Sequence, residues 1–221
     1  MGNYFVFWGI AGIISGLLAA LADVPLVKPG KPDPDHKTVW GGIEPWWAEV
    51  PSKRFVVSFW LSFLGQPATY VTMWLLAELI GRNNEQLEMA LKINTFIGCF
   101  TGLFCHIAFC IRPLLYQKLH EKLSDEESLK VINSINPLVK APLTIGFLTL
   151  WLGGTVIVAI AILTGALHVS KWCLLLNPVV SLIVLMILKK LKVKIIGPLG
   201  VGYSLFAILL VIAGIGGSSA A

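Results

Sequence analysis

Residues 143–164 read LTIGFLTLWLGGTVIVAIAILT, and this stretch decides the fold class. It contains no Lys, Arg, Asp or Glu over 22 residues. The hydrocarbon core of a bilayer is about 30 Å thick, and a helix needs roughly 20 apolar residues to cross it. The stretch is therefore predicted to be a membrane-spanning helix.

Five further stretches of similar character lie on either side of it. They are Tyr4 to Ala22, Phe55 to Ala77, Ile93 to Ile111, Trp172 to Leu188 and Leu199 to Ile215. Over the whole chain of 221 residues, 56% are hydrophobic and only 13% are charged, whereas soluble domains contain roughly 25% charged residues. We therefore expect an all-α polytopic transmembrane helix bundle with six spans, forming a single domain over residues 1–221.

The basic residues are divided unequally between the two sides of this predicted bundle. Fourteen of the 17 Lys and Arg residues fall in or beside three loops, at residues 24–54, 116–142 and 189–197. Because cytoplasmic loops carry the excess of Lys and Arg, these loops are predicted to be cytoplasmic and both termini outside. Insertion in a bilayer also accounts for the net charge of +5 without a nucleic-acid partner.

Two of these loops are long enough to form structure of their own. The first contains Trp40, Trp46 and Trp47, so it is expected to lie along the headgroup layer or to fold over the mouth of the bundle. A structural belt is favoured there over a ligand lid. The second contains a capping box that starts at Ser124, which predicts a short amphipathic helix on the inner leaflet that stops near Asn136-Pro137.

No motif in the sequence fixes a reaction. The chain lacks GxSxG, HExxH and P-loop patterns, and its four cysteines form no CxxC pair. Cys99, His106 and Cys110 are spaced to share a helical face, but one helix cannot close a tetrahedral site. We therefore predict no metal site and expect no cofactor.

Ionisable residues within the predicted bundle are the main candidates for a site, because charge is costly there. His106 lies in the third predicted span, and it is either a packed, hydrogen-bonded histidine or a residue that binds a ligand or handles a proton. Asp23 closes the first span and Arg112 follows the third. An Asp23–Arg112 ion pair at the inner mouth is one expectation, and snorkelling of both side chains into the headgroups is the other.

Two further polar residues are candidates for the same region. Gln66-Pro67 lies near the centre of the second predicted span, where proline removes a helical hydrogen bond, so a kink is expected. Gln66 and His106 are predicted to lie at similar depth, with a polar pocket between the second and third spans. Tyr203, near the start of the sixth span, is the last candidate for the wall of this pocket.

Several short motifs carry a resemblance to a known family. They are Asp23 after a Gly-rich first span, Arg54 before the second, His106 in the third, Trp172 and Leu176-Asn177-Pro178 in the fifth, and Gly200 to Tyr203 opening the sixth. Together they resemble a family of small bacterial six-span membrane proteins known only as a domain of unknown function. The resemblance covers most of the chain and implies a bacterial cytoplasmic membrane, but it implies no activity.

Three functions are compatible with these residues. The leading hypothesis is a bundle that binds a small amphipathic molecule or lipid in a cleft open to the cytoplasmic side. Asp23 and Arg112 would contact its polar end, and Gln66, His106 and Tyr203 would line the deeper wall. One alternative is an intramembrane enzyme with His106 as the catalytic acid or base on a lipid-like substrate. The other is a substrate-binding subunit of a transporter, and both a transporter partner and a homo-oligomer stay open.

Overall fold

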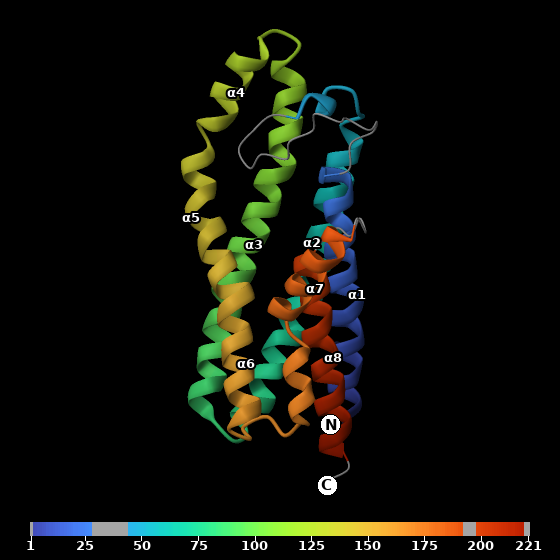
Figure 1. Ribbon diagram of the computed structural model, residues 1–221, viewed down its shortest axis with the longest axis vertical. Helices are drawn as coiled ribbons and strands as arrows, with labels where there is room; N and C mark the ends of the chain where they lie inside the picture. Colours follow the sequence, from blue (N-terminus) through green and yellow to red (C-terminus); the bar gives the residue numbers. More distant parts are fainter. Residues whose placement is uncertain (1, 28–43, 192–197, 219–221) are drawn as a thin grey trace.

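The computed structural model describes residues 2–27, 44–191 and 198–218, which form helices joined by short turns (Figure 1). The long helices α1, α2 and α3 span Gly2–Val27, Lys53–Gly81 and Glu85–Leu119. A short helix α4 (Asp125–Asn133) is followed by α5 (Asn136–Gly146), a π-helical segment η2 (Phe147–Gly153) and α6 (Gly154–Leu163). The chain ends with α7 (Pro178–Lys190) and α8 (Pro198–Ser218), and the 3₁₀ segments η1 (Pro45–Trp47) and η3 (Lys171–Leu175) precede α2 and α7.

The helices confirm the predicted all-α class, and no strand occurs in the described ranges. Three of them, Gly2–Leu26, Glu85–Leu119 and Asn136–Leu163, are long and apolar enough to cross a membrane. Pro178–Leu188 and Gly200–Gly216 are shorter apolar helices. Large apolar side chains on the outside of the bundle remain exposed, among them Phe7, Leu64 and Phe100. A surface of this kind is typical of a protein surrounded by lipid.

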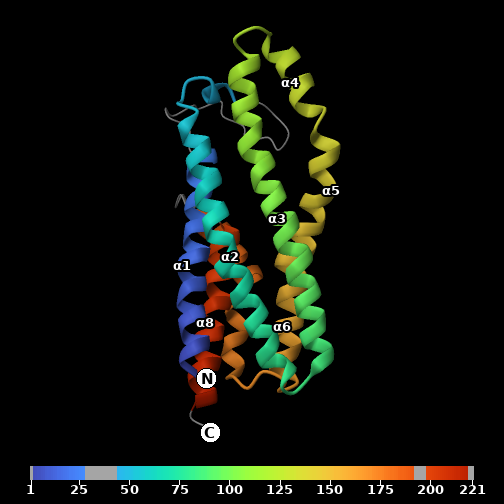
Figure 2. The ribbon, with the colours of Figure 1, turned by 180° about the vertical axis from the view of Figure 1, so that it is seen from behind.

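The helices form an elongated bundle in which α1 lies between α8 and α2 (Figures 1 and 2). On the other side of α2, α3 packs against α5, η2 and α6. The start of α1 and the end of α8 lie at one end of the bundle, which we call the terminal end. The opposite end carries η1 and α4, and we call it the α4 end.

Glycines bring α1 and α8 into backbone contact. A β-carbon placed on Gly16 of α1 would lie 2.6 Å from the carbonyl oxygen of Gly200 and 2.8 Å from the backbone nitrogen of Ser204. Small residues of this kind allow two helix backbones to approach closely, which is the usual basis of helix packing in membranes. The position of α1 therefore depends on the missing side chain at Gly16.

The capping box predicted at Ser124 is confirmed. The Ser124 hydroxyl accepts from the backbone nitrogen of Glu127, and the Glu127 carboxylate accepts from the backbone nitrogen of Ser124 at 3.0 Å. The Ser124 hydroxyl also donates to the Glu127 carboxylate at 2.8 Å, and this bond and the one from the Ser124 backbone N–H favour the charged form, so the pKa of Glu127 lies below its usual value. The helix is predicted to stop near Asn136-Pro137, and α4 ends at Asn133, three residues earlier; Asn136 and Pro137 instead begin α5. Proline is tolerated there because the first turn of a helix does not use its N–H groups.

Much of the predicted loop at residues 116–142 is helical. Helix α3 continues to Leu119, and α5 contains everything from Asn136 onward, so the turns are confined to 120–124 and 134–135. Of the other two predicted loops, residues 28–43, with Trp40, and 192–197 lie outside the described residues.

The stretch 143–164 that decides the fold class is not a uniform α-helix. It contains η2, where the backbone carbonyls of Thr149 and Leu150 accept hydrogen bonds from side chains of other helices. The Asn94 amide donates to Thr149 at 3.0 Å, and the Tyr203 hydroxyl donates to Leu150 at 3.4 Å. Helix α2, by contrast, continues through Pro67 as one helix.

We expect the substitution Gly16→Ala to destabilise the protein by about 1–3 kcal/mol, the usual cost of overpacking. An alanine within a helix would otherwise stabilise it by up to about 1 kcal/mol. The measurement is thermal unfolding in detergent followed by circular dichroism. Gly216→Ala is the matched control, because a β-carbon there has no neighbour within 4 Å. A Gly16→Ala variant as stable as this control would contradict the proposed α1–α8 contact.

Candidate functional site

The hydroxyl group of Ser58 on α2 joins three helices toward the α4 end. Its oxygen lies 2.7 Å from the carbonyl oxygen of Ala22 on α1, 3.2 Å from Nε2 of His106 and 3.5 Å from Sγ of Cys110, both on α3. A hydroxyl has one hydrogen to donate and two lone pairs to accept with. With its hydrogen donated to Ala22, it accepts from His106 and Cys110, so this completely buried group is fully satisfied.

The same contacts assign the proton on the His106 ring. Nε2 also lies 3.3 Å from the backbone carbonyl oxygen of Ser58, which can only accept. Since Nε2 faces this oxygen and a hydroxyl whose hydrogen is already donated, the hydrogen-bond network assigns it as the N–H donor. In the neutral imidazole, Nδ1 is then an acceptor.

Asp23, one residue before the last turn of α1, lies on the Nδ1 side of this ring. Its Oδ1 is 3.8 Å from Nδ1, which is an ion-pair distance but longer than a hydrogen bond. The Asp23 side chain is 35% exposed and that of His106 is 12% exposed. The structure therefore brings together two of the predicted site residues and leaves the carboxylate accessible.

The predicted ion pair between Asp23 and Arg112 is wrong. Arg112 is buried, and its guanidinium donates to Oδ1 of Asn136 on α5 at 3.2 Å. Arg112 follows His106 by six positions on α3, and at 3.6 residues per turn their directions differ by about 120°. His106 consequently faces α1 and α2, whereas Arg112 faces α5.

The two remaining predicted wall residues lie elsewhere. Gln66 is half-buried on α2, and it follows Ser58 by eight residues, or about 12 Å of helix. The structure thus brings Ser58, and not Gln66, against His106. Tyr203 is buried in the core, where its hydroxyl bonds to Leu150 and its ring lies 6.5 Å from that of Phe206.

Arg54 closes the end of α1 beside this site. Its Nε donates to the carbonyl oxygen of Pro25 at 2.7 Å, and an Nη donates to that of Val24 at 3.4 Å. Its guanidinium also lies 5.1 Å from the ring centre of Trp46. A cation at the C-terminal end of a helix is favourable because the last carbonyls are unpaired and the helix dipole is negative there.

Residues before α2 fold over this end of the bundle, one of the two arrangements expected for the first loop. Trp46 and Trp47 are buried and pack with Phe55, Tyr116 and Ile132. The side-chain amide of Gln117 on α3 fixes the segment by donating to the backbone carbonyls of Trp47 and Val50 at 2.7 and 2.6 Å. The structure therefore places aromatic side chains directly over the ends of α2 and α3.

Sequence reasoning missed Ser58 and Gln117. Helix α2 carries a second buried serine, Ser62, and nothing in the pattern distinguishes it from Ser58. The role of Ser58 follows only from its position opposite Ala22 and His106.

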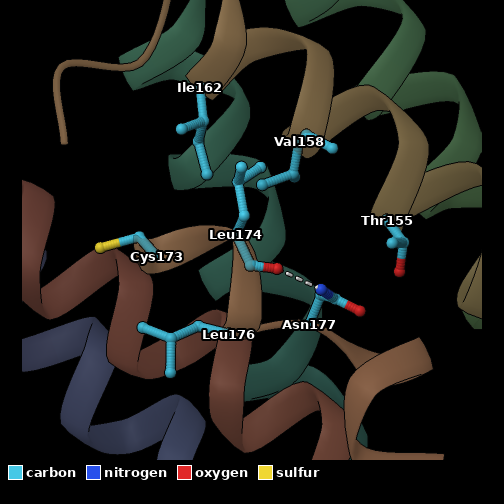
Figure 3. Close-up of a pocket in the computed structure, with 8 residues that line it drawn as sticks. Thr155, Val158, Ile162, Cys173, Leu174, Leu176 and Asn177 are labelled. Carbon is cyan, nitrogen blue, oxygen red and sulfur yellow. Dashed lines mark hydrogen bonds between the residues drawn. The ribbon is translucent and has the colours of Figure 1, made fainter. Parts of the chain in front are cut away.

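Two hollows lie away from this site. The first, of about 10 Å³, lies between α6 and the η3–α7 segment (Figure 3). It is lined by Thr155, Val158, Ala159, Ile162, Cys173, Leu174, Leu176 and Asn177. The second is a groove of about 350 Å³ along α1 and α2, lined by Tyr4, Tyr70, Val71, Trp74, Leu75 and Glu78. The first has room for about one water molecule, and none of the predicted site residues lines either.

Within the described part of the chain, no group of three or more His, Cys, Asp or Glu side chains is arranged to hold a metal ion. Cys110 instead donates to Ser58, and His106 uses Nε2 for the same residue. The described side chains of the site offer hydrogen bonding, charge and proton transfer at Asp23 and His106.

We expect Ser58→Ala to destabilise the bundle by about 1–3 kcal/mol, because two hydrogen bonds of the buried hydroxyl, to the Ala22 carbonyl and from His106, are lost at about 0.5–1.5 kcal/mol each. Chemical unfolding in detergent measures the change. Ser134→Ala serves as the control, since its hydroxyl bonds to Val131 in an exposed turn, where water replaces it. Equal stability of the two variants would show that the three-helix junction contributes nothing.

The chain also matches a known family. A model described as a family of unknown function, DUF6796, matches residues 7–216, which includes Asp23, Ser58 and His106. No curated protein and no solved structure matches the chain. Because the match extends over nearly the whole chain, the protein belongs to the family of unknown function DUF6796.

Proposed function

We propose that the chain is an integral protein of a bacterial cytoplasmic membrane, with six spans and both termini outside. The three long apolar helices support a membrane location. The unequal distribution of Lys and Arg supports the orientation. Lys118, Lys122 and Lys130 belong to the α4 end, which is then the cytoplasmic end of the protein.

At this end we propose that Asp23 and His106 bind the polar head of a small amphipathic molecule or lipid. The observation that carries the proposal is the hydrogen-bonding capacity that the described residues leave unfilled at this pair. Nδ1 of His106 and the Asp23 carboxylate are 3.8 Å apart, too far to bond directly, and the carboxylate is one-third exposed. Leu103 and Phe109, one turn to either side of His106 on α3, are half-buried and supply apolar surroundings for a chain. Arg112, Gln66 and Tyr203 do not belong to this site.

Native mass spectrometry of protein released from nanodiscs of bacterial lipid extract tests this function. We expect a discrete adduct on the wild type, reduced at least about tenfold in Asp23→Asn and His106→Gln, because each variant loses a hydrogen bond that involves a charged group. Glu78→Gln, an exposed carboxylate at the terminal end, is the control and keeps the adduct. Bare wild-type protein, or equal occupancy in all variants, would contradict a site at this pair.

A second candidate function is catalysis, because Ser58, His106 and Asp23 follow the order of a hydrolytic triad. Ser58 Oγ lies at Nε2 and the carboxylate lies on the Nδ1 side, as in serine hydrolases. The Ser58 hydroxyl, however, is completely buried and donates its hydrogen to Ala22. Binding is therefore the better supported function.

A fluorophosphonate probe, which reacts with activated serines, separates these two functions. We expect no labelling of Ser58 in the membrane-embedded wild type, because the hydroxyl is inaccessible and its proton is already shared. Mass spectrometry of the peptide that contains Ser58 is the readout, with Ser58→Ala as the blank. Stoichiometric labelling that disappears in His106→Gln would instead establish the enzyme.

A further inference from the structure

The direction of each hydrogen bond around His106 limits what the site can bind. Nε2 is assigned as a donor because it faces two oxygens of Ser58. Nδ1 of the neutral ring is therefore an acceptor, and it faces the carboxylate of Asp23, which when ionised is also an acceptor. Two acceptors 3.8 Å apart repel each other unless a hydrogen-bond donor lies between them or one of the two atoms is protonated.

We infer that this site binds a protonated primary or secondary amine in exchange for one proton. The inference rests on the proposed function and names the class of head group. It covers the amine of a lipid headgroup and that of a single-chain amphiphile, because both present the same ammonium.

The geometry selects an ammonium among common head groups. An atom roughly 2.8 Å from each acceptor fits beside a pair 3.8 Å apart, provided that it carries two hydrogens to donate. A primary or secondary ammonium has at least two N–H groups, whereas an alcohol has one and an ionised sulfate has none. A trimethylammonium group carries the same charge but has no N–H to donate.

In the described part of the chain, the hydrogen bonds of the nearby guanidinium groups to backbone and amide oxygens are directed away from the Asp23 carboxylate, so the pair can accept one positive charge. On α2, the Arg54 guanidinium donates to backbone carbonyls of α1, and on α3, Arg112 donates to α5. The Cys110 thiol is directed to Ser58, and α8, which packs along α1, has no Asp, Glu, Lys, Arg or His from Pro198 to Ser218. Among the described residues, His106 is the ion-pair partner of Asp23.

Without the amine, the pair holds one proton in its place. This proton is bound to either the imidazole Nδ1 or the carboxylate. When the ammonium binds, it donates one N–H to each acceptor, and the proton is released to water at the exposed carboxylate. The exchange takes up one positive charge and releases one, so the charge of the site does not change. No covalent bond other than this N–H or O–H bond is broken.

Isothermal titration calorimetry in an uncharged detergent tests the exchange with two matched probes. Dodecylamine and dodecyltrimethylammonium have the same chain and charge and differ in N–H groups. We expect dodecylamine to bind at least about tenfold more tightly. In two buffers of different ionisation enthalpy, we expect release of about one proton per dodecylamine, and a fall in affinity of up to about tenfold per pH unit below neutrality.

Variants locate the exchange at the pair. We expect Asp23→Asn and His106→Gln to lose both the selectivity and the proton release, whereas Glu78→Gln retains both. Nanodiscs containing phosphatidylethanolamine or phosphatidylcholine distinguish the sources of the amine. If phosphatidylethanolamine competes with dodecylamine and phosphatidylcholine does not, the amine belongs to a lipid headgroup. If neither lipid competes, the amine belongs to a free amphiphile.

The outcomes separate this inference from the function on which it rests. Equal binding of the two probes, or binding without proton release, would overturn the amine exchange and leave an amphiphile site in place. Absence of binding by either probe to folded wild type, together with bare protein in the mass spectrum, would overturn both. The comparison between probes uses wild-type protein, so it does not depend on whether a variant folds.

Discussion

The hydrogen bond from the Ser58 hydroxyl to the Ala22 carbonyl is the constraint on which the site depends. A carbonyl oxygen has two lone pairs, so the Ala22 carbonyl can accept from Ser58 in addition to its own helix. Because the hydroxyl has one hydrogen, its donation to α1 requires His106 to donate through Nε2. The bond that packs α1 on α2 thus also sets the tautomer of the imidazole and turns Nδ1 toward Asp23.

The sequence allowed the all-α class and most of the helices to be predicted, but not the contacts that the candidate site residues make. Long uncharged stretches determine the helices because exposed backbone is too costly in lipid. Counting residues from the basic loops predicts the depth of Asp23 and Arg112 along the axis of the bundle, and it places the two at the same depth. Whether two residues meet also depends on the direction of each around its helix. Arg112 is about 120° from His106 on α3, so its contact is Asn136 and not Asp23.

Tertiary donors explain a second feature that local pattern could not predict. In the π-helical segment η2, backbone hydrogen bonds join residues five positions apart instead of four. The carbonyls of Thr149 and Leu150 there accept from the side chains of Asn94 and Tyr203. A hydrophobic stretch is equally compatible with an α-helix or a π segment when read alone. Tyr203, interpreted from the sequence as part of a pocket wall, donates its hydroxyl hydrogen to this backbone.

The position of Arg54 explains how an acidic residue can lie near the end of α1 and still face the candidate site. The C-terminal end of a helix is negative, so an ionised Asp23, one residue before the last turn of α1, is repelled by its own helix. The positive charge of Arg54, on α2, offsets this repulsion. Its guanidinium donates to the carbonyl oxygens of Val24 and Pro25 and not to the Asp23 carboxylate. Its charge therefore stabilises the end of the helix, while the carboxylate remains turned toward His106. A cation that paired directly with Asp23 would stabilise α1 equally well and would close the site.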